Sequence, residues 1–305
     1  MKKAYQIAVM ARLGWNLHSM NNEGTVGNVT MGRKVTLPRS TPAGIETLET
    51  DMVSGEMLKH GFVESLWTRF GTDQLCPDCK TLRPVRASKA ASHKEALACP
   101  ICDLSGYMAV AKGGLNLKRY APIEFGMSVA LPEAVAMQKH IHARHRRDVD
   151  EAEGETAAAS DQMIYYRPTR SGQYAFHALL NAWKIGVDDT TFEAVVEKDS
   201  RWSRFSTALY ALADVMIFPQ GAMRATRLAH VTEAQGIIVV TEINAFVPRW
   251  SPLDDQYREM VEGMLSNADE VDGEGVRAFR FDDPVELLGA MKTVTKEYEP
   301  WSAGA

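Results

Sequence analysis

Four cysteines in two closely spaced pairs are the residues of this chain whose spacing most clearly indicates chemistry. Cys76 and Cys79 form one Cys-x-x-Cys pair, and Cys99 and Cys102 form a second after 19 intervening residues. Two such pairs at this spacing can hold one tetrahedral Zn²⁺ through four thiolates. All four coordination positions are then filled, so the sequence predicts a structural zinc and not a catalytic one. Reduced cysteines without a metal are the alternative.

The segment between the two cysteine pairs is basic. Its only acidic residue is Glu95, and its basic residues are Lys80, Arg83, Arg86, Lys89 and Lys94. A zinc ion that orders this loop would make it a cationic projection. A loop that zinc merely keeps ordered, with no binding role, fits the composition equally well.

A second basic segment covers residues 139–147 and contains three histidines. No Asp or Glu lies between Ala134 and Arg147 to complete a metal site or to orient an imidazole, which argues against a metal-dependent hydrolase. We interpret the segment as an arm that contacts phosphate, with His142 and Arg144 as candidates. A solvated basic segment, neutralised by the acidic residues at 148–155, is the alternative.

Two further features could bind an anion. Gly221 is followed by Arg224 and Arg227, and a glycine lets the backbone approach a ligand while planar guanidinium groups clasp phosphate or carboxylate. The hydroxyl of Ser54 can cap a helix whose free amides favour negative charge. Each of these features is weak when taken alone.

The elements that must position these residues are a mixture of strands and helices, and we expect an α+β protein. Alternating apolar residues predict a long half-buried strand over 4–17, and a capped apolar stripe predicts a helix over 54–70. Residues 132–147 fit either a helix or an extended arm, residues 38–44 read as a loop, and the acidic segment 148–160 reads as a mobile loop. Further strands are predicted at 31–37, 123–131, 163–166, 236–243 and 276–281, and further helices at 174–183, 202–212 and from residue 284 onward.

Composition narrows the class of protein. The chain has 305 residues, 45% of them hydrophobic, and no stretch approaches the roughly 18 apolar residues of a membrane helix. With cysteines suited to metal and no export signal, we expect a cytoplasmic protein with no membrane partner.

No nucleophile elbow, phosphate-binding loop, dinucleotide fingerprint or zinc-protease motif occurs. An enzyme would therefore have to assemble its active site from scattered residues.

The charge is divided between the two halves of the chain. The net formal charge is −5, but residues 1–147 carry 20 Lys and Arg against 12 Asp and Glu, whereas residues 148–305 carry 14 against 27. This division fits a basic groove on an acidic body, and it fits equally well copies that stack head to tail.

Taken in order, several short motifs resemble the DevR-type backbone subunits of the CRISPR-associated Cascade complex, which belong to the repeat-associated (RAMP) superfamily. The most specific is the Ser-Gly-Glu-x-x-Lys-His segment at 54–60. The resemblance spans roughly residues 4–230, and its other motifs lie at 11–16, 27–28, 33–34, 142–144, 162–164, 171–174 and 221–224.

The resemblance implies a palm like an RNA-recognition motif, with inserted finger and thumb elements. The four-cysteine zinc module, which is not a universal feature of the family, would be an additional insertion. Its domains would be residues 1–70 for the first part of the palm, 71–117 for a zinc-ribbon-like insertion, 118–160 for the basic arm and acidic loop, and 161–305 for the rest. Such subunits are non-catalytic: they oligomerise along a guide RNA (crRNA), present it to target DNA, and assemble with other Cascade subunits.

The resemblance also implies which residues face the guide. A subunit that accepts any guide sequence should contact phosphate and ribose and leave the base edges free. The candidate RNA-contacting residues are Asn16, Asn28, Arg33, Lys34, Ser54, Lys59, His60, His142, Arg144, Gly221, Arg224 and Arg227. Two alternatives stay open: a RAMP endoribonuclease that uses Asp51, His60 or His142, and a zinc-dependent DNA-binding regulator.

Overall fold

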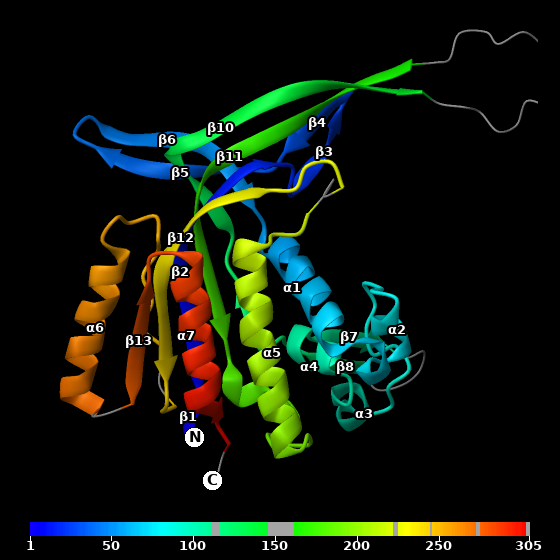
Figure 1. The fold of residues 1–305 in the computed structure, drawn as a ribbon, viewed down its shortest axis with the longest axis vertical. Helices are drawn as coiled ribbons and strands as arrows, with labels where there is room; N and C mark the ends of the chain where they lie inside the picture. The colour runs from blue at the N-terminus through cyan, green and yellow to red at the C-terminus, as the bar shows by residue number, and fades with distance from the viewer. Residues whose placement is uncertain (111–115, 146–161, 222–224, 245, 273–274, 303–305) are drawn as a thin grey trace, which may run out of the picture.

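A computed structural model describes residues 1–305 except 111–115, 146–161, 222–224, 245, 273–274 and 303–305. Its largest sheet has the spatial order β13-β12-β2-β11-β10-β6-β5, and every neighbouring pair along this path is antiparallel (Figure 1). These strands are β2 (Gln6–His18), β5 (Lys34–Thr41), β6 (Gly44–Val53), β10 (Ser128–His145), β11 (Gln162–Leu180), β12 (His230–Thr241) and β13 (Val276–Phe281).

Shorter strands extend this framework. Strand β4 pairs with β3 and β11, β9 pairs with β11, β7 pairs with β8, and β1 pairs with β14 near the two termini. Their bounds are β1 (Lys2–Ala4), β3 (Asn22–Val26), β4 (Val29–Gly32), β7 (Tyr107–Val110), β8 (Asn116–Arg119), β9 (Ile123–Phe125) and β14 (Tyr298–Pro300).

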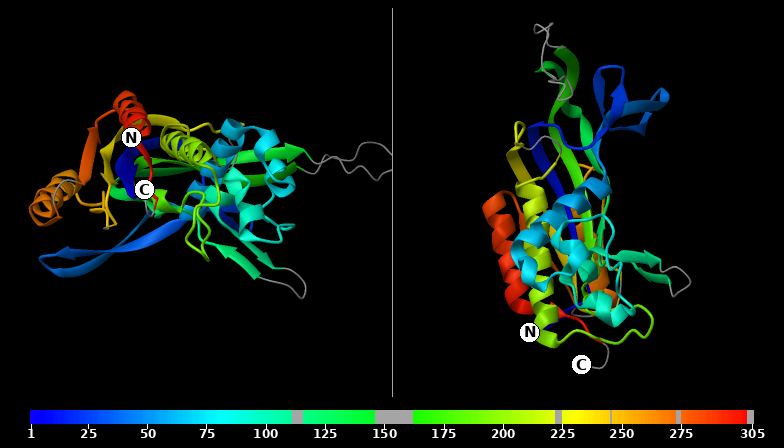
Figure 2. Two further views of the ribbon diagram at one scale, coloured as in Figure 1. Left: turned by 90° about the horizontal axis from the view of Figure 1, so that it is seen from below. Right: turned by 90° about the vertical axis from the view of Figure 1, so that its right-hand side faces the viewer.

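Helices cover one face of the sheet. Helices α5 and α7 lie side by side on it and α1 lies beside α5, as the views in Figures 1 and 2 show. The helices are α1 (Gly55–Phe70), α2 (Pro77–Lys80), α3 (His93–Leu97), α4 (Pro100–Ser105), α5 (Lys198–Ile217), α6 (Tyr257–Asp272) and α7 (Pro284–Glu297), with two short 3₁₀ helices at Thr72–Gln74 and Ala182–Lys184. None of the described helices is long and apolar enough to span a membrane. The protein therefore combines helices with an antiparallel sheet, as predicted.

Strand β2 lies at the centre of the core. Its odd-numbered residues from Ile7 to Trp15 are fully buried against the helices, which confirms the predicted alternation. The opposite face is also partly covered, because Met10 packs against Tyr257 of α6 in a second, smaller core. Leu17 departs from the pattern: its φ is 56° and it is 52% exposed, since the pairing of β2 with β11 is irregular there.

Strands β10 and β11 form a long arm. Their inner ends belong to the sheet, and their outer halves continue to pair from Val135↔Gly172 to His145↔Gln162 as they project from the body (Figure 1). Of the two predictions for residues 132–147, the extended arm is therefore correct. The predicted mobile loop at 148–160 lies outside the described residues.

Two predictions of local structure were wrong. Residues 174–180, assigned to a helix on their apolar spacing, belong to β11, and the helical turn is confined to Ala182–Lys184. Both faces of this strand are apolar, because the second core covers part of the outer face, and such strands lack a clear alternation. The segment 38–44, assigned to a loop, is largely the end of β5 and its turn into β6. Pro38 is tolerated there because β5 is the edge strand of the sheet.

Candidate nucleic-acid interface and metal centre

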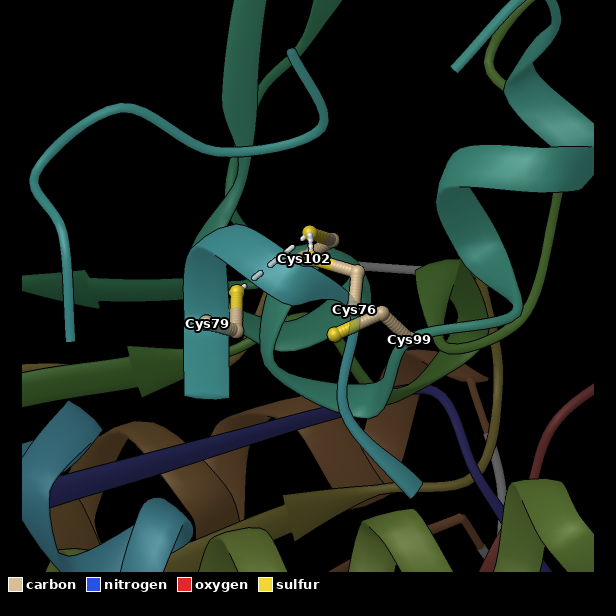
Figure 3. A group of neighbouring side chains, drawn as sticks. All are labelled: Cys76, Cys79, Cys99 and Cys102. Carbon is tan, nitrogen blue, oxygen red and sulfur yellow. Dashed lines mark hydrogen bonds between the residues drawn. The ribbon is translucent and has the colours of Figure 1, made fainter. Parts of the chain in front are cut away.

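The four cysteine side chains converge on one point (Figure 3). Cys76 and Cys99 cap two short helices that begin with proline, and Cys79 and Cys102 follow within each first turn. All four Sγ atoms lie within 4.8 Å of one another, and that of Cys102 is 3.7 Å from that of Cys76 and 3.6 Å from that of Cys79.

These distances discriminate between a disulfide and a metal site. A disulfide requires an S–S distance of about 2.05 Å. Four sulfurs at about 2.3 Å from a tetrahedral zinc are instead separated by about 3.8 Å. The donor set therefore fits Zn²⁺, in line with the prediction for Cys76, Cys79, Cys99 and Cys102.

A buried carboxylate joins this cysteine module (residues 71–119) to the rest of the protein. Asp103 follows Cys102 directly and is fully buried. It accepts hydrogen bonds from Arg119 at 2.6 Å, Arg204 at 2.7 Å and the backbone amide of Gly186 at 3.0 Å. Arg204 also donates to the carbonyls of residues 97 and 98, directly before Cys99. The sequence analysis missed Asp103, because its partners are 16 to 101 residues away.

A groove of about 690 Å³ lies beside the arm. The cross-strand register places His142 opposite Tyr165 and His140 opposite Arg167, so that these four side chains share one face of the arm. The rings of His142 and Tyr165 stack with their centroids 5.4 Å apart. The groove is lined by Leu17, His140, His142, Thr169, Ala225, Thr226, Arg227, Leu228 and His230.

Arg227 holds this groove together. Its guanidinium donates to the carbonyl of Pro168 at 2.7 Å, to the Ser19 hydroxyl at 2.9 Å and to Nε2 of His142 at 2.5 Å. Because arginine only donates, Nε2 of His142 is the acceptor and Nδ1 carries the proton. Burial, followed by the charge of Arg227, lowers the pKa of His142, which favours this neutral form. His142 and Arg227, two candidate RNA contacts 85 residues apart in the sequence, are thus brought together.

Other predicted contacts lie around the arm and are engaged within the protein. Asn16 donates to Thr232 at 2.8 Å, and Asn28 donates to the carbonyl of residue 164 at 3.3 Å. Lys34 is paired with Glu49 on the exposed β5–β6 hairpin, and Arg33 lies 3.6 Å from a carboxylate oxygen of Glu23. Exposed pairs of this kind are weak and can exchange for phosphate.

The predicted contacts on α1 divide into buried and accessible ones. Ser54 is 3% exposed and caps the helix, since its hydroxyl accepts the amide of Met57 at 3.3 Å. His60 is exposed and lies 3.5 Å from Glu64. Lys59 is half-buried and lines a hollow of about 430 Å³ between the start of α1 and residues 120–127.

The glycine loop is described only in part. Arg224 and the side chain of Arg144 lie outside the described residues. A Cβ added to Gly221 would come within 2.5 Å of Cγ of Met20, so this glycine permits close packing within the protein. Whether it also approaches a ligand stays a prediction.

A buried polar network fixes the base of the arm. Arg170, fully buried, donates to Asp51 at 2.7 Å, and the hydroxyl of Tyr174 donates to the other oxygen of Asp51 at 2.6 Å. His18 lies 2.9 Å from that hydroxyl, and its Nδ1 accepts the amide of Met20. His18 is therefore a neutral donor through Nε2. Asp51, a candidate for the endoribonuclease alternative, is 3% exposed and committed to this network.

This network predicts a loss of stability in acid. Burial, together with the charge of Arg170, lowers the pKa of His18 to about 3. The unfolded chain, with a pKa of about 6.5, binds a proton that the folded chain does not over that range, so stability falls as the pH drops from about 6.5 toward 3. In the middle of this pH range, His18 should change the free energy of unfolding by about 1.4 kcal/mol per pH unit.

Denaturant unfolding at several pH values checks this. Asp51 contributes in the opposite direction, because burial raises its pKa, so the informative quantity is the difference in slope between the wild type and His18→Gln. The variant should show the shallower dependence between about pH 6.5 and 4. Equal slopes would contradict the assignment of a neutral His18.

The sequence matches the family model "CRISPR-associated negative auto-regulator DevR/Csa2" over residues 9–262. The chain belongs to the DevR/Csa2 family. This confirms the resemblance drawn from the motifs. No curated protein matches the sequence of this DevR/Csa2 protein.

Solved structures similar to this DevR/Csa2 protein include two chains of a "CRISPR RNA-guided surveillance complex". The first is 11% identical with a TM-score of 0.49, and the match covers 95% of this chain and 99% of that chain. The second comes from a pre-nicking complex and is 10% identical with a TM-score of 0.49, and the match covers 94% of this chain and 99% of that chain. Csc2 of Thermofilum pendens is 14% identical with a TM-score of 0.39, over 95% of this chain and 82% of that one.

Proposed function

We propose that this DevR/Csa2 protein is a non-catalytic, guide-RNA-binding subunit of a type I CRISPR surveillance complex. Copies of it line up along one guide RNA, hold the sugar-phosphate backbone, and leave the bases free to pair with target DNA. Other Cascade subunits complete the particle. The observation that carries the proposal is the groove beside the arm, bordered by His140, His142, Arg227 and His230, in a chain of this family.

The topology supports a palm like an RNA-recognition motif. Along the chain, β2 leads through α1 to the pair β10 and β11, and β11 leads through α5 to β12. In space the four strands have the order β12-β2-β11-β10, all antiparallel. This is the β-α-β-β-α-β arrangement of ferredoxin-like palms. The cysteine module is then an insertion after α1, and the arm is an extension of the central hairpin.

The chemistry of the groove suits a backbone rather than a base sequence. Imidazole and guanidinium groups donate hydrogen bonds to phosphate and ribose oxygens, which carry no sequence information. Arg227 fixes His142 in the tautomer that exposes Nδ1–H, so the donor is preorganised. A subunit that must accept any guide needs donors of this kind.

The structural zinc would be held by Cys76, Cys79, Cys99 and Cys102, and it would supply folding energy to the module. No step of catalysis is assigned to the protein. Of the acids and bases considered for RNA cleavage, Asp51 is buried in an ion pair with Arg170 and His142 is held by Arg227.

Co-expression with a guide tests the proposal. The wild type should co-purify with RNA of discrete length, visible in the absorbance ratio and mass of the particle. Lys59→Glu combined with Arg33→Glu should release most of that RNA, because each substitution places a negative charge beside a phosphate. Lys292→Glu with Lys296→Glu, the same charge change on the exposed side of α7, serves as the control.

Three outcomes would contradict the proposal. In the first, the particle assembles fully without RNA. In the second, Lys59→Glu with Arg33→Glu leaves the RNA content as unchanged as the control pair does. Sequence-selective binding to duplex DNA without any guide would instead support the regulator alternative.

A further inference from the structure

Five cations between the two cysteine pairs form no ion pair with a described carboxylate. Lys80, Arg83, Lys89 and Lys94 are exposed, Arg86 is half-buried, and none forms an ion pair with a described acidic side chain. The nearby carboxylate of Asp78 is occupied by the amide and hydroxyl of Ser88, at 2.9 and 2.6 Å.

Many cations on the body form ion pairs with acidic side chains. On the body, Lys34 pairs with Glu49, Lys198 with Glu299 at 3.1 Å, and Arg277 with Glu297. A concentration of unpaired positive charge on one module is costly unless an anionic partner neutralises it. Five such cations within the 15 residues from Lys80 to Lys94 give the module the charge that an anion-binding surface needs.

The module's charge is continuous with α1. Arg86 lies near enough to Lys59 for its positive charge to lower the pKa of that lysine, after the larger effect of burial. Lys59 and Arg86 therefore both lie at the junction of α1 and the module. Lys59 also lines the hollow beside residues 120–127, where the chain returns from the module. Tyr120 in this hollow is exposed, and the ammonium group of Lys118 lies over its ring.

The module is also anchored firmly enough to present these charges. The buried contacts of Asp103 with Arg119 and Arg204 join it to β8 and α5, and the indole of Trp67 donates to the carbonyl of Lys80 at 3.1 Å. A preorganised cationic surface loses less conformational entropy on binding than a mobile loop does.

From these observations we infer that the cysteine module is a second binding surface for a phosphodiester backbone, continuing the nucleic-acid path from Lys59 across Arg86 to Arg83, Lys89 and Lys94. The inference rests on the proposed function. Its ligand is the sugar-phosphate chain itself, either RNA beyond the segment in the palm or DNA. The competing partner is the acidic flank of a second copy, since residues 251–300 carry 13 Asp and Glu against 5 Lys and Arg.

The test compares charge-neutralised variants of the full, zinc-loaded protein. Arg83→Gln, Lys89→Gln and Lys94→Gln are combined, and Lys198→Gln, Lys292→Gln and Lys296→Gln on α5 and α7 form a control with the same change in charge. The dissociation constants for a fluorescent RNA of about 30 nucleotides and for a DNA duplex of about 30 base pairs, both of arbitrary sequence, are measured from about 50 to 200 mM salt. Metal content and melting temperature establish that each variant is folded.

We expect the module variant to bind about tenfold or more weakly, and its salt slope to fall by about 2 for RNA or about 3 for duplex DNA, because each lost phosphate contact removes roughly 0.7 or 0.9 from that slope. The nucleic acid that shows the change identifies the source of the backbone. The control should match the wild type.

Two results would overturn the inference. In one, the wild type binds RNA and the module variant binds both nucleic acids with unchanged slope, which leaves the proposed function standing. In the other, nucleic-acid binding is unchanged but sedimentation shows weaker self-association of the module variant, which assigns the surface to a second copy. A wild type that binds neither nucleic acid overturns the proposed function as well.

Discussion

Removal of zinc is expected to unfold the cysteine module. The module is a short insertion whose buried apolar side chains, such as Leu75 and Ile101, join the main core of the protein, and units this small usually need a metal for stability. Structural zinc contributes about 10–16 kcal/mol in small zinc-binding peptides. Its loss should therefore release the module from α1 and α5 and lower the thermal stability of the whole chain.

Chelation followed by limited proteolysis and calorimetry measures this effect. The loaded protein should contain one zinc per chain and resist cleavage at Lys80–Lys94, and the stripped protein should be cut there. Cys99→Ser should behave like the stripped protein. His93→Ala should retain zinc, because His93 bonds to the hydroxyl of Tyr107 at 2.7 Å and is not a ligand. Identical melting curves with and without zinc would contradict the assignment.

Asp103→Asn is expected to destabilise the protein by about 3–5 kcal/mol, because it leaves the buried guanidinium groups of Arg119 and Arg204 without their counter-charge. The side chain of Arg119 is fully buried and that of Arg204 nearly so, and so neither can recover hydration. The carbonyls before Cys99 would lose their orientation when Arg204 moves, and the affinity of the module for zinc should fall too.

Asp189→Asn is the matched control. Asp189 also pairs with Arg119, at 3.2 Å, but its side chain is 26% exposed, so its loss should cost about 1 kcal/mol or less. Denaturant unfolding of the zinc-loaded proteins distinguishes the two. Equal effects of the two substitutions would show that Asp103 is not the junction between module and body.

The features of the fold and of the candidate site that could be predicted are those set by residues close together in the sequence. The cysteine cluster was found because the two pairs of cysteines are local in sequence. The core face of β2 and the capped start of α1 were found because alternation and capping are local signals. Asp103 and Arg170 were missed, since their partners lie tens of residues away and nothing near them marks an ion pair.

The errors have a related cause. Strand β11 is apolar on both faces where it crosses the sheet, so Tyr174, Phe176 and Leu180 fitted a helical spacing by coincidence. The β5–β6 hairpin was missed because Pro38 suggested a loop, whereas an edge strand tolerates proline. Among the candidate contacts, Lys59 and His142 reached accessible positions, and Ser54 became a buried cap.

The most direct test of the central claim is RNA–protein crosslinking of the assembled wild-type particle, with the crosslinked peptides identified by mass spectrometry. If the groove beside the arm holds the guide, crosslinks should concentrate at residues 139–142, 165–169 and 225–230, with a second group around Lys59. RNA crosslinked only to other surfaces, or a particle that carries no RNA, would contradict the account.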